Sequence, residues 1–407
     1  MEERENQLWT GGSWEHPEEA FPAIPPVVIP KRPMQPRRRK KKRSGKRRIP
    51  WFAAFIAVIF VGALAIAALR GSVYGGLMPR PPEDEYVNES TEPPEIPRAE
   101  TGSGLTITLE GEHGPELDFS QIYEQVSPSI VTIEAVMDEG VGSGTGIILS
   151  EDGYILTNAH VVAGGTEVWV LLSDNQGCEA KLVGFQNEED LAVLKINRSG
   201  LTPASFGDSA LLSPGDQVAA LGTPLGYRST ITGGIISGLN RSVDSQRGEM
   251  IMLQTSAPIN HGNSGGALIN RFGQVVGVNT IKIVLDDGGA EALGFAIPSR
   301  RVKYVADRLI AGEPVEKGVF GFTVLTLPEP KGGLGLIDVD ENSDCYKKGL
   351  RLGDVVVAVN GRNIESTEDL AAVKLDLGPG DMLDLTYRRD GQEKTIQVAL
   401  EKPSEEP

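Results

Sequence analysis

Short apolar runs separated by turns of Gly, Asn and Asp dominate the chain from residue 118 to residue 297. Val, Ile and Leu are frequent in these runs, and the runs follow one another closely. Closely spaced runs of this β type are typical of an all-β barrel domain. The sequence therefore predicts a mostly β fold for this region. The predicted strands cover residues 130–136, 144–150, 167–172, 217–221, 231–238, 250–254 and 274–281.

After Pro298 the apolar residues change to helical spacing. Val302, Val305 and Leu309 recur at intervals of three and four residues, which places them on one face of a helix. Gly312 follows as a helix stop signal. We therefore expect one amphipathic helix directly after the β region.

A second, smaller domain is predicted at residues 316–402. Asn360 and Gly361 form a strong signal for a two-residue hairpin turn. Ser366 and Asp369 have the S-x-x-D spacing that starts a helix. This domain should therefore combine strands with a short helix.

The longest apolar stretch is residues 51–69, which contains 19 residues and no charge. A helix of this length spans about 28 Å, close to the ~30 Å hydrocarbon core of a bilayer. Residues 31–48 directly before it contain 12 Lys and Arg, which marks the cytoplasmic side. We predict a single transmembrane helix at residues 49–70 in the cell membrane, with a cytoplasmic N-terminus and an extracellular remainder. A cleaved signal peptide is the alternative, because small residues such as Ala63 and Ala65 offer cleavage sites.

The segments that flank this stretch should be disordered. Residues 1–48 form a predicted cytoplasmic basic tail, and residues 71–117 form a predicted linker rich in Pro and acidic residues. Residues 1–50 contain 13 Lys and Arg against 6 Asp and Glu, whereas the rest of the chain contains 26 against 50. An acidic folded part argues against nucleic-acid binding.

Cysteine and histidine usage indicates neither a disulfide nor a metal site. Cys178 and Cys345 fall in different predicted domains, so we expect both to be free thiols. No Cys or His cluster has metal-ligand spacing, and no phosphate-binding or dinucleotide-binding glycine motif occurs. We expect no metal and no cofactor.

A candidate nucleophile lies in residues 260–270, which read NHGNSGGALIN. Ser264 is surrounded by glycines, and glycine permits the unusual turn that aims backbone N–H groups at one point. An oxyanion that forms on a carbonyl under attack needs such donors. We predict that Gly262, Asn263 and Ser264 form this oxyanion hole, with the N–H groups of Gly262 and Ser264 as its donors. The alternative is a hairpin turn without chemistry.

A serine hydroxyl needs a base to accept its proton. The chain has four histidines: His16, His113, His160 and His261. The first precedes the apolar stretch, the second lies in the predicted linker, and the last is tethered to the serine loop itself. His160, at the end of an apolar run in GYILTNAHVV, is therefore the candidate base.

Asp190 is the candidate that orients the imidazole of this base. It stands in NEEDLAVLKI, directly before the apolar run 191–194. Glu188 and Glu189 have the pattern of solvated turn residues. Asp190 is therefore the acid that we expect at a barrel rim, although a solvated acidic turn would read the same way.

The order His160, Asp190, Ser264 is the chain order of chymotrypsin-type proteases. The motifs TNAHVV, DLAVLKI, LGTPLG, GNSGGAL and GFAIPS follow in the order found in one family. The chain from about residue 118 to 402 resembles the HtrA/DegP family of trypsin-like serine proteases. The resemblance implies a chymotrypsin-like double β-barrel protease domain at residues 118–313 and a PDZ domain at residues 316–402.

The resemblance also implies an activity and its partners. Members of this family are extracytoplasmic serine endopeptidases that degrade misfolded or damaged proteins, and they assemble as homotrimers without a cofactor. A peptide-binding chaperone or scaffold with little turnover is the alternative function.

Two binding regions are carried over from the same resemblance. The position six residues before the nucleophile, here Pro258, lies at the base of the specificity pocket, and Leu293 should line its wall. Both are uncharged, so we expect a small-to-medium aliphatic residue before the scissile bond. In the PDZ domain a nest for hydrophobic C-terminal peptides is expected at Val319, Phe320, Gly321 and Phe322.

The sequence departs from the family pattern at His261 and Ala267, where the family usually has proline. Proline fixes the backbone angle φ, so its loss at position 261 frees the entrance to the serine loop. We expect the resting loop to be less ordered than in other members.

Overall fold

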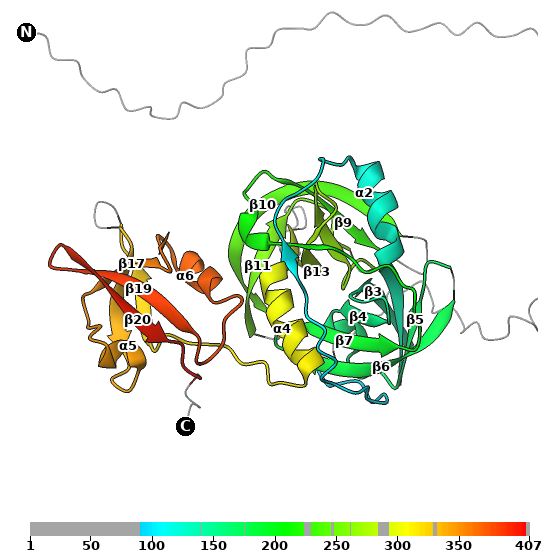
Figure 1. Ribbon diagram of the computed structural model, residues 1–407, viewed down its shortest axis with the longest axis horizontal. Coiled ribbons are helices and arrows are strands. Elements are labelled where there is room, and N and C mark those ends of the chain that lie inside the picture. Colours follow the sequence, from blue (N-terminus) through cyan, green and yellow to red (C-terminus); the bar gives the residue numbers. More distant parts are fainter. Residues whose placement is uncertain are drawn as a thin grey trace, which may run out of the picture. The chain divides into compact units, whose positions relative to one another are not determined.

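The computed structural model describes residues 90–403 except 139, 175, 224–228, 246–247, 261, 284–292 and 329–331 (Figure 1). The chain divides into two units, residues 1–78 and residues 79–407, and the described residues belong to the second. The predicted basic tail and transmembrane helix, and His261, lie outside the described residues. Among the residues that the structure describes, no helix has the length and the apolar character needed to cross a bilayer.

The first half of the β region forms a closed six-stranded barrel in the order β2-β3-β4-β7-β6-β5. Its interior is filled by fully buried aliphatic side chains such as Ile133, Ile155 and Leu194. Gly146 leaves the room that they occupy, because a Cβ there would lie 2.8 Å from Ile155 and 3.0 Å from Ile133. The strands are β2 (Ile130–Met137), β3 (Gly140–Ile148), β4 (Tyr154–Thr157), β5 (Glu167–Leu171), β6 (Gly177–Gln186) and β7 (Leu191–Ile196).

The second half forms another barrel in the order β13-β12-β9-β10-β11-β14, which the pairing of β13 with β14 closes. Two short strands, β1 (Leu109–Glu110) and β8 (Phe206–Gly207), extend this sheet. The predicted double barrel is therefore confirmed. The barrel strands are β9 (Gln217–Gly222), β10 (Thr230–Ser245), β11 (Gly248–Thr255), β12 (Ala267–Asn270), β13 (Val275–Ile283) and β14 (Leu293–Pro298).

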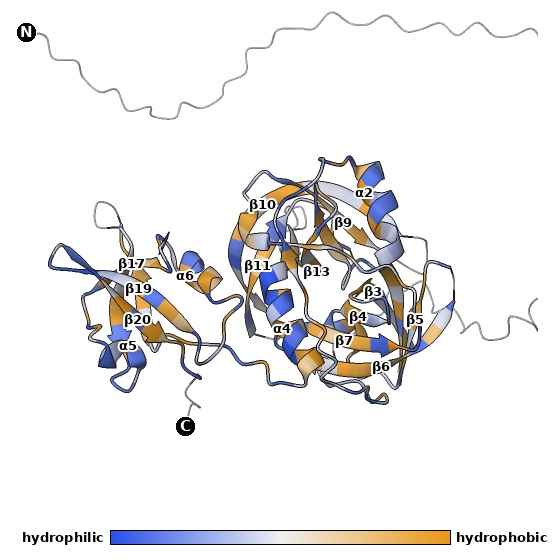
Figure 2. Ribbon diagram, viewed as in Figure 1, coloured by the Kyte–Doolittle hydropathy of each residue, from blue (hydrophilic) through white to orange (hydrophobic). Residues whose placement is uncertain are grey.

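Helices cover the outside of the barrels, and Figure 2 shows hydrophilic residues on the exposed sides of α2 and α4. The predicted amphipathic helix is α4, which buries Val302 and Val305 completely and ends at Gly312 with φ 76°. It packs on β6, where a Cβ at Gly184 would lie 2.7 Å from Leu309. The helical elements here are α2 (Phe119–Val126), η1 (Ser127–Ser129), α3 (Ala159–Val162), η2 (Ser209–Leu211) and α4 (Ser299–Ala311).

Residues 90–117 lie against the barrels, so the prediction of a disordered linker is wrong for this part of 71–117. Ile96 and Ile107 are buried, with 7% and 6% of their surface exposed. The backbone N–H of Ala99 donates to the Leu182 carbonyl at 2.9 Å. The acidic and proline-rich composition of the segment hid these few apolar residues, which are enough to anchor an extended chain.

The C-terminal domain is a sheet in the order β15-β16-β17-β19-β20, with β18 paired to β17. The predicted hairpin turn is present, since Asn360 and Gly361 both have positive φ, 49° and 74°. The capping box of Ser366 and Asp369 also forms at the start of α6. The elements are β15 (Phe322–Thr326), β16 (Leu334–Val339), α5 (Asp344–Lys347), β17 (Val355–Val359), β18 (Arg362–Asn363), α6 (Thr367–Val373), β19 (Met382–Arg389) and β20 (Gln392–Ala399).

Both cysteines are free, as predicted. Cys345 is fully buried in the core of the C-terminal domain. Burial, with a smaller contribution from Asp344, raises the pKa of this thiol to about 12. Cys345 is therefore a packing residue rather than a reactive thiol.

The anchoring of residues 90–117 predicts a loss of stability on truncation of one side chain. Ile107→Ala should lower the free energy of unfolding by about 2–5 kcal/mol, because it leaves a cavity in the core. Denaturant unfolding of the full chain measures this change. Thr108→Ala, at the exposed neighbouring position, is the matched control and should change little. Equal stability of the two variants would contradict the anchoring.

Candidate active site

The structure brings His160 and Asp190 into contact. His160 lies on the single turn α3 after β4, and Asp190 lies in the turn before β7. His160 Nδ1 is 2.9 Å from both carboxylate oxygens of Asp190, and the His160 backbone N–H donates to Oδ1 at 3.1 Å. Asp190 is fully buried. This carboxylate therefore fixes both the ring and the backbone of the histidine.

The backbone around Asp190 is held in an uncommon conformation. Its φ is 50°, in the left-handed region that residues other than glycine rarely occupy. The side-chain amide of Asn158 donates to the Asp190 carbonyl at 2.8 Å, and the Asp190 N–H donates to the Asn187 carbonyl at 3.0 Å. Strain of this kind persists only where neighbouring contacts determine the conformation, and it is common at active sites.

Thr280, on β13 of the second barrel, connects the carboxylate to the serine. Its hydroxyl donates a short hydrogen bond to Asp190 Oδ2. Its carbonyl oxygen accepts the hydroxyl of Ser264 at 3.2 Å. Thr280 was not recognised from the sequence, where the only signal is a hydroxyl residue at the end of an apolar strand. Its two hydrogen bonds place Ser264 and Asp190 on either side of one residue.

The loop before β12 turns twice at glycines, since Gly262 has φ 44° and Gly265 has φ 79°. Thr145, from β3 of the first barrel, pins the loop: its hydroxyl donates to the Gly262 carbonyl at 2.7 Å, and its N–H donates to the Ser264 carbonyl at 2.9 Å. A Cβ at Gly265 would lie 2.2 Å from the Thr145 carbonyl, so only glycine fits there. Thr145 is a second residue that sequence reasoning missed.

Within the described part of the chain, the backbone N–H groups of Gly262 and Ser264 have no hydrogen-bond acceptor, although both residues are buried. Buried N–H groups are almost always paired. Two unpaired donors, two residues apart beside a serine hydroxyl, are therefore suited to an anion that forms there.

Asn263 has a different part from the one predicted. Its N–H donates to the Asn260 carbonyl at 3.1 Å and is not available to an oxyanion. Its side chain accepts the Asn260 N–H at 3.0 Å and donates to the Pro258 carbonyl at 3.3 Å. Asn263 therefore shapes the loop, and the N–H groups left open in the described loop are those of Gly262 and Ser264.

The predicted pocket residues Pro258 and Leu293 are exposed and partly buried, respectively. Ile259, which directly follows Pro258 in the chain, is buried and was not predicted as a pocket residue. A Cβ at Gly294 would lie 2.6 Å from Cγ1 of Ile259, so the Ile259 side chain fills the space beside β14 of the second barrel. Ile259 and Leu293 are therefore the aliphatic side chains of this predicted pocket.

Glu189, expected as a solvated residue, is buried, with 4% of its surface exposed. Its carboxylate accepts two hydrogen bonds from Arg301, at 2.7 and 2.8 Å, and lies 3.3 Å from the Lys317 ammonium. Burial alone would raise the pKa of Glu189, but the two cations outweigh it and hold the pKa below its usual value. Because this charge is paired, Glu189 supports the turn that holds Asp190.

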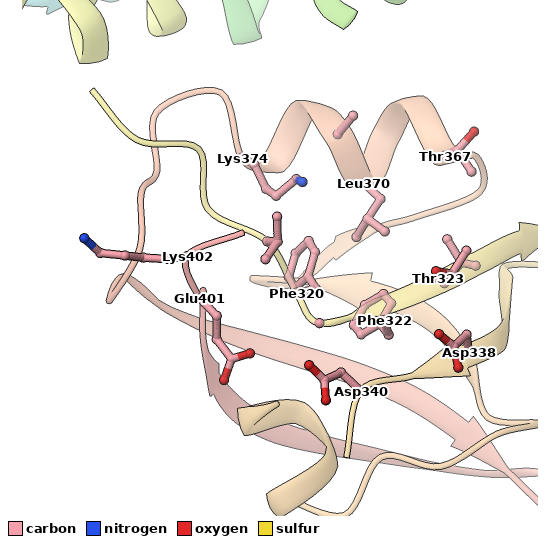
Figure 3. Close-up of a pocket in the computed structure, with 14 residues that line it drawn as sticks. Phe320, Phe322, Thr323, Asp338, Asp340, Thr367, Leu370, Lys374, Glu401 and Lys402 are labelled. Carbon is pink, nitrogen blue, oxygen red and sulfur yellow. The ribbon is translucent and has the colours of Figure 1, made fainter. Parts of the chain in front are cut away.

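The C-terminal domain has a groove of about 420 Å³ between its edge strand β15 and helix α6 (Figure 3). The predicted residues Val319, Phe320, Gly321 and Phe322 all line it. Gly321 has φ 70°, and in the described part of the chain no acceptor is found for the N–H of Phe320 or of Gly321. The groove therefore ends in two open backbone donors.

Lys374, at the end of α6, is a groove residue that was not predicted. Figure 3 shows its side chain reaching over Phe320, and Nζ lies 5.6 Å from the ring centroid. Burial lowers the pKa of this ammonium, and the nearby cation Arg301 lowers it further. An anion at the end of the groove would meet both the open N–H groups and this cation.

Comparisons with known proteins agree with this architecture. The sequence pattern of the trypsin-like peptidase domain family matches residues 144–278, and that of the PDZ domain family matches residues 318–400. Serine protease Do-like HtrB of Bacillus subtilis is 35% identical over 409 residues, which cover 89% of this chain and 85% of that protein.

Two further relatives are informative. A probable periplasmic serine endoprotease DegP-like of Halomonas elongata is 37% identical over 267 residues, and the match spans 63% of this chain and 56% of that longer protein. Among solved structures, the HtrA-type protease AlgW with tripeptide has a TM-score of 0.56 at 29% identity and covers 71% of this chain and 98% of that one. This chain therefore belongs to the HtrA/DegP family of trypsin-like serine proteases, in a form with one PDZ domain.

Proposed function

We propose that Ser264 is the nucleophile of this protease, that His160 is its general base, and that Asp190 orients the base. The observation that carries the proposal is the chain of contacts from His160 through Asp190 and Thr280 to Ser264. The two unpaired N–H groups of Gly262 and Ser264 are a second observation that supports it.

The proposed reaction begins when the Ser264 hydroxyl rotates away from the Thr280 carbonyl and attacks a peptide carbonyl. Nε2 of His160 accepts the hydroxyl proton, because Asp190 holds the proton on Nδ1. The Gly262 and Ser264 N–H groups stabilise the oxyanion. His160 then donates its proton to the leaving amine, and water attacks the acyl-enzyme by the same route.

The substrate preference follows from the pocket. Pro258, Ile259 and Leu293 bring no charge, so Lys and Arg side chains gain no counter-ion there. A small-to-medium aliphatic residue before the scissile bond fits this aliphatic setting.

The groove of the PDZ domain is proposed to bind hydrophobic C-terminal peptides. Solved relatives contain a tripeptide or a decapeptide. A peptide added to the open edge of β15 would place its carboxylate on the N–H groups of Phe320 and Gly321. The ammonium of Lys374 supplies the counter-charge at this end, and Leu370 together with Phe322 would surround the last side chain.

The cellular setting is also a proposal. The apolar run 51–69 after a strongly basic segment supports a membrane anchor with the protease domain outside the cell. An anchored extracytoplasmic protease with a C-terminus sensor suits the degradation of misfolded or damaged proteins. Assembly as a homotrimer is proposed from the family alone.

Replacement of the nucleophile tests the central role. Ser264→Ala should reduce peptide hydrolysis by several orders of magnitude, because the catalytic groups act as a unit. The thermal unfolding of the variant should stay that of the parent. A fluorophosphonate probe, which reacts with activated serines, should label the parent and not the variant. Equal labelling of both would contradict the assignment, and a parent that binds casein without cleaving it would favour the chaperone alternative.

Thr280 should act by positioning Asp190. Thr280→Val removes one hydrogen bond to a charged group, a loss of about 1.5–3 kcal/mol, so kcat should fall about tenfold or more with little change in KM. Thr280→Ser should retain most of the activity, because it keeps the hydroxyl. Thr202→Val, at an exposed position of the same domain, is the control. If the Val and Ser variants lost activity equally, the hydroxyl would not be the functional group.

The anchor can be tested by one charge in the apolar run. Ile59→Arg should move the protein from the membrane fraction, since Arg at the centre of a span costs about 2.5–3.5 kcal/mol. Ile59→Leu is the matched control and should stay in the membrane. Protease added to intact cells should remove the catalytic domain of the control. Recovery of the parent from the cytosol, or its resistance to the added protease, would contradict the predicted topology.

A further inference from the structure

The groove in the PDZ domain has an acidic wall. Asp338 and Asp340 line the groove on β16 and directly after it, and both are exposed. In the described residues no ion pair or hydrogen bond engages the Asp338 carboxylate. An unpaired carboxylate beside a peptide site favours a cationic group on the peptide.

The direction of a bound peptide follows from the two ends of the groove. The open N–H groups of Phe320 and Gly321 and the ammonium of Lys374 lie at one end, where β15 begins. A peptide whose carboxylate binds there runs toward the start of β15. It is therefore antiparallel to this strand.

The register follows from the same contact. A peptide whose carboxylate meets the N–H groups of Phe320 and Gly321 would set its last residue beside Phe322, the first residue of β15, and its penultimate residue beside Thr323. Phe322 is partly buried and packs on the domain core, whereas Thr323 is exposed. Side chains opposite one another on neighbouring strands share a face of the sheet. The last side chain therefore points into the apolar groove, and the penultimate one points to the exposed face with Thr323.

Asp338 lies on that exposed face. Thr323 and Asp338 are Cα partners in the pairing of β15 with β16, and Figure 3 shows them on adjacent strands. The penultimate residue and Asp338 are then two strand spacings apart, about 10 Å between Cα atoms. The long side chain of Lys or Arg can cross Thr323 and reach the carboxylate. Asp340, whose N–H donates to the Gly321 carbonyl at 2.9 Å, adds negative charge to the same wall.

We propose that the groove selects C-terminal peptides with an apolar last residue and a Lys or Arg immediately before it, and that Asp338 reads this basic residue. The proposal rests on the proposed role of the groove as a binding site for C-terminal peptides. It makes the groove a reader of two features, a free carboxylate and a penultimate cation.

The test uses the full-length chain with Ser264→Ala, so that the peptide is not cleaved. Fluorescence anisotropy compares heptapeptides that end in Lys-Val, Gln-Val or Glu-Val, each as free acid, with a Lys-Val peptide blocked as the C-terminal amide. The Lys-Val acid should bind about three- to fivefold more tightly than the Gln-Val acid, as expected of an exposed ion pair. The Glu-Val acid should bind most weakly of the three.

Two variants assign the preference to its residue. Asp338→Asn should remove most of the difference between the Lys-Val and Gln-Val acids and leave the affinity for the Gln-Val acid nearly unchanged. Asp384→Asn makes the same charge change at an exposed position of β19 outside the groove and should keep the preference. Added salt should weaken the preference in the parent.

The outcomes separate the two proposals. Equal affinity for the Lys-Val and Gln-Val acids in the parent, or a preference that survives Asp338→Asn, would overturn the proposal for the penultimate residue. If the amide bound as tightly as the acid, or if no peptide bound, the proposed carboxylate site itself would fail. Tighter binding of the acid than of the amide, without a Lys preference, would leave the carboxylate site standing and sink only the further inference.

Discussion

A buried carboxylate is the feature on which the active site depends. Asp190 is removed from water, and an ionised group in that position is costly unless donors surround it. The backbone N–H of His160 and the hydroxyl of Thr280 donate to it, and Nδ1 of the His160 ring lies 2.9 Å from both of its oxygens. Because the carboxylate must be satisfied, each donor is fixed in place by the same interaction.

This requirement joins the two barrels into one site. His160 and Asp190 belong to the first barrel, whereas Thr280 and Ser264 belong to the second. Thr145 makes the reverse connection, since it extends from the first barrel to the carbonyls of the serine loop. Neither barrel alone contains His160, Asp190, Thr280 and Ser264, so the geometry of the site is a property of the packing of the two barrels.

Much of this architecture could be predicted from local sequence. The short apolar runs between turns located strands such as β2, β5 and β9, and the glycine-rich loop marked Ser264. Residues whose role depends on contacts across the fold could not be predicted. Thr145 and Thr280 look like ordinary strand residues, and Glu189 stands in an acidic turn that predicts exposure, whereas it is buried and paired with Arg301. The packing of residues 90–117 against the barrels was not predicted either, because the average composition of the segment hides its few buried side chains.

The tautomer of His160 decides whether this histidine can serve as the base. Nitrogen NMR of histidine-labelled full-length protein, recorded well above the ordinary imidazole pKa of about 6.5, reports which ring nitrogen carries the proton. We expect a proton on Nδ1, held by Asp190, with Nε2 free to accept the serine proton. Asp190→Asn should lose this arrangement. A proton on Nε2 in the parent protein would contradict the proposed role of His160 as the base.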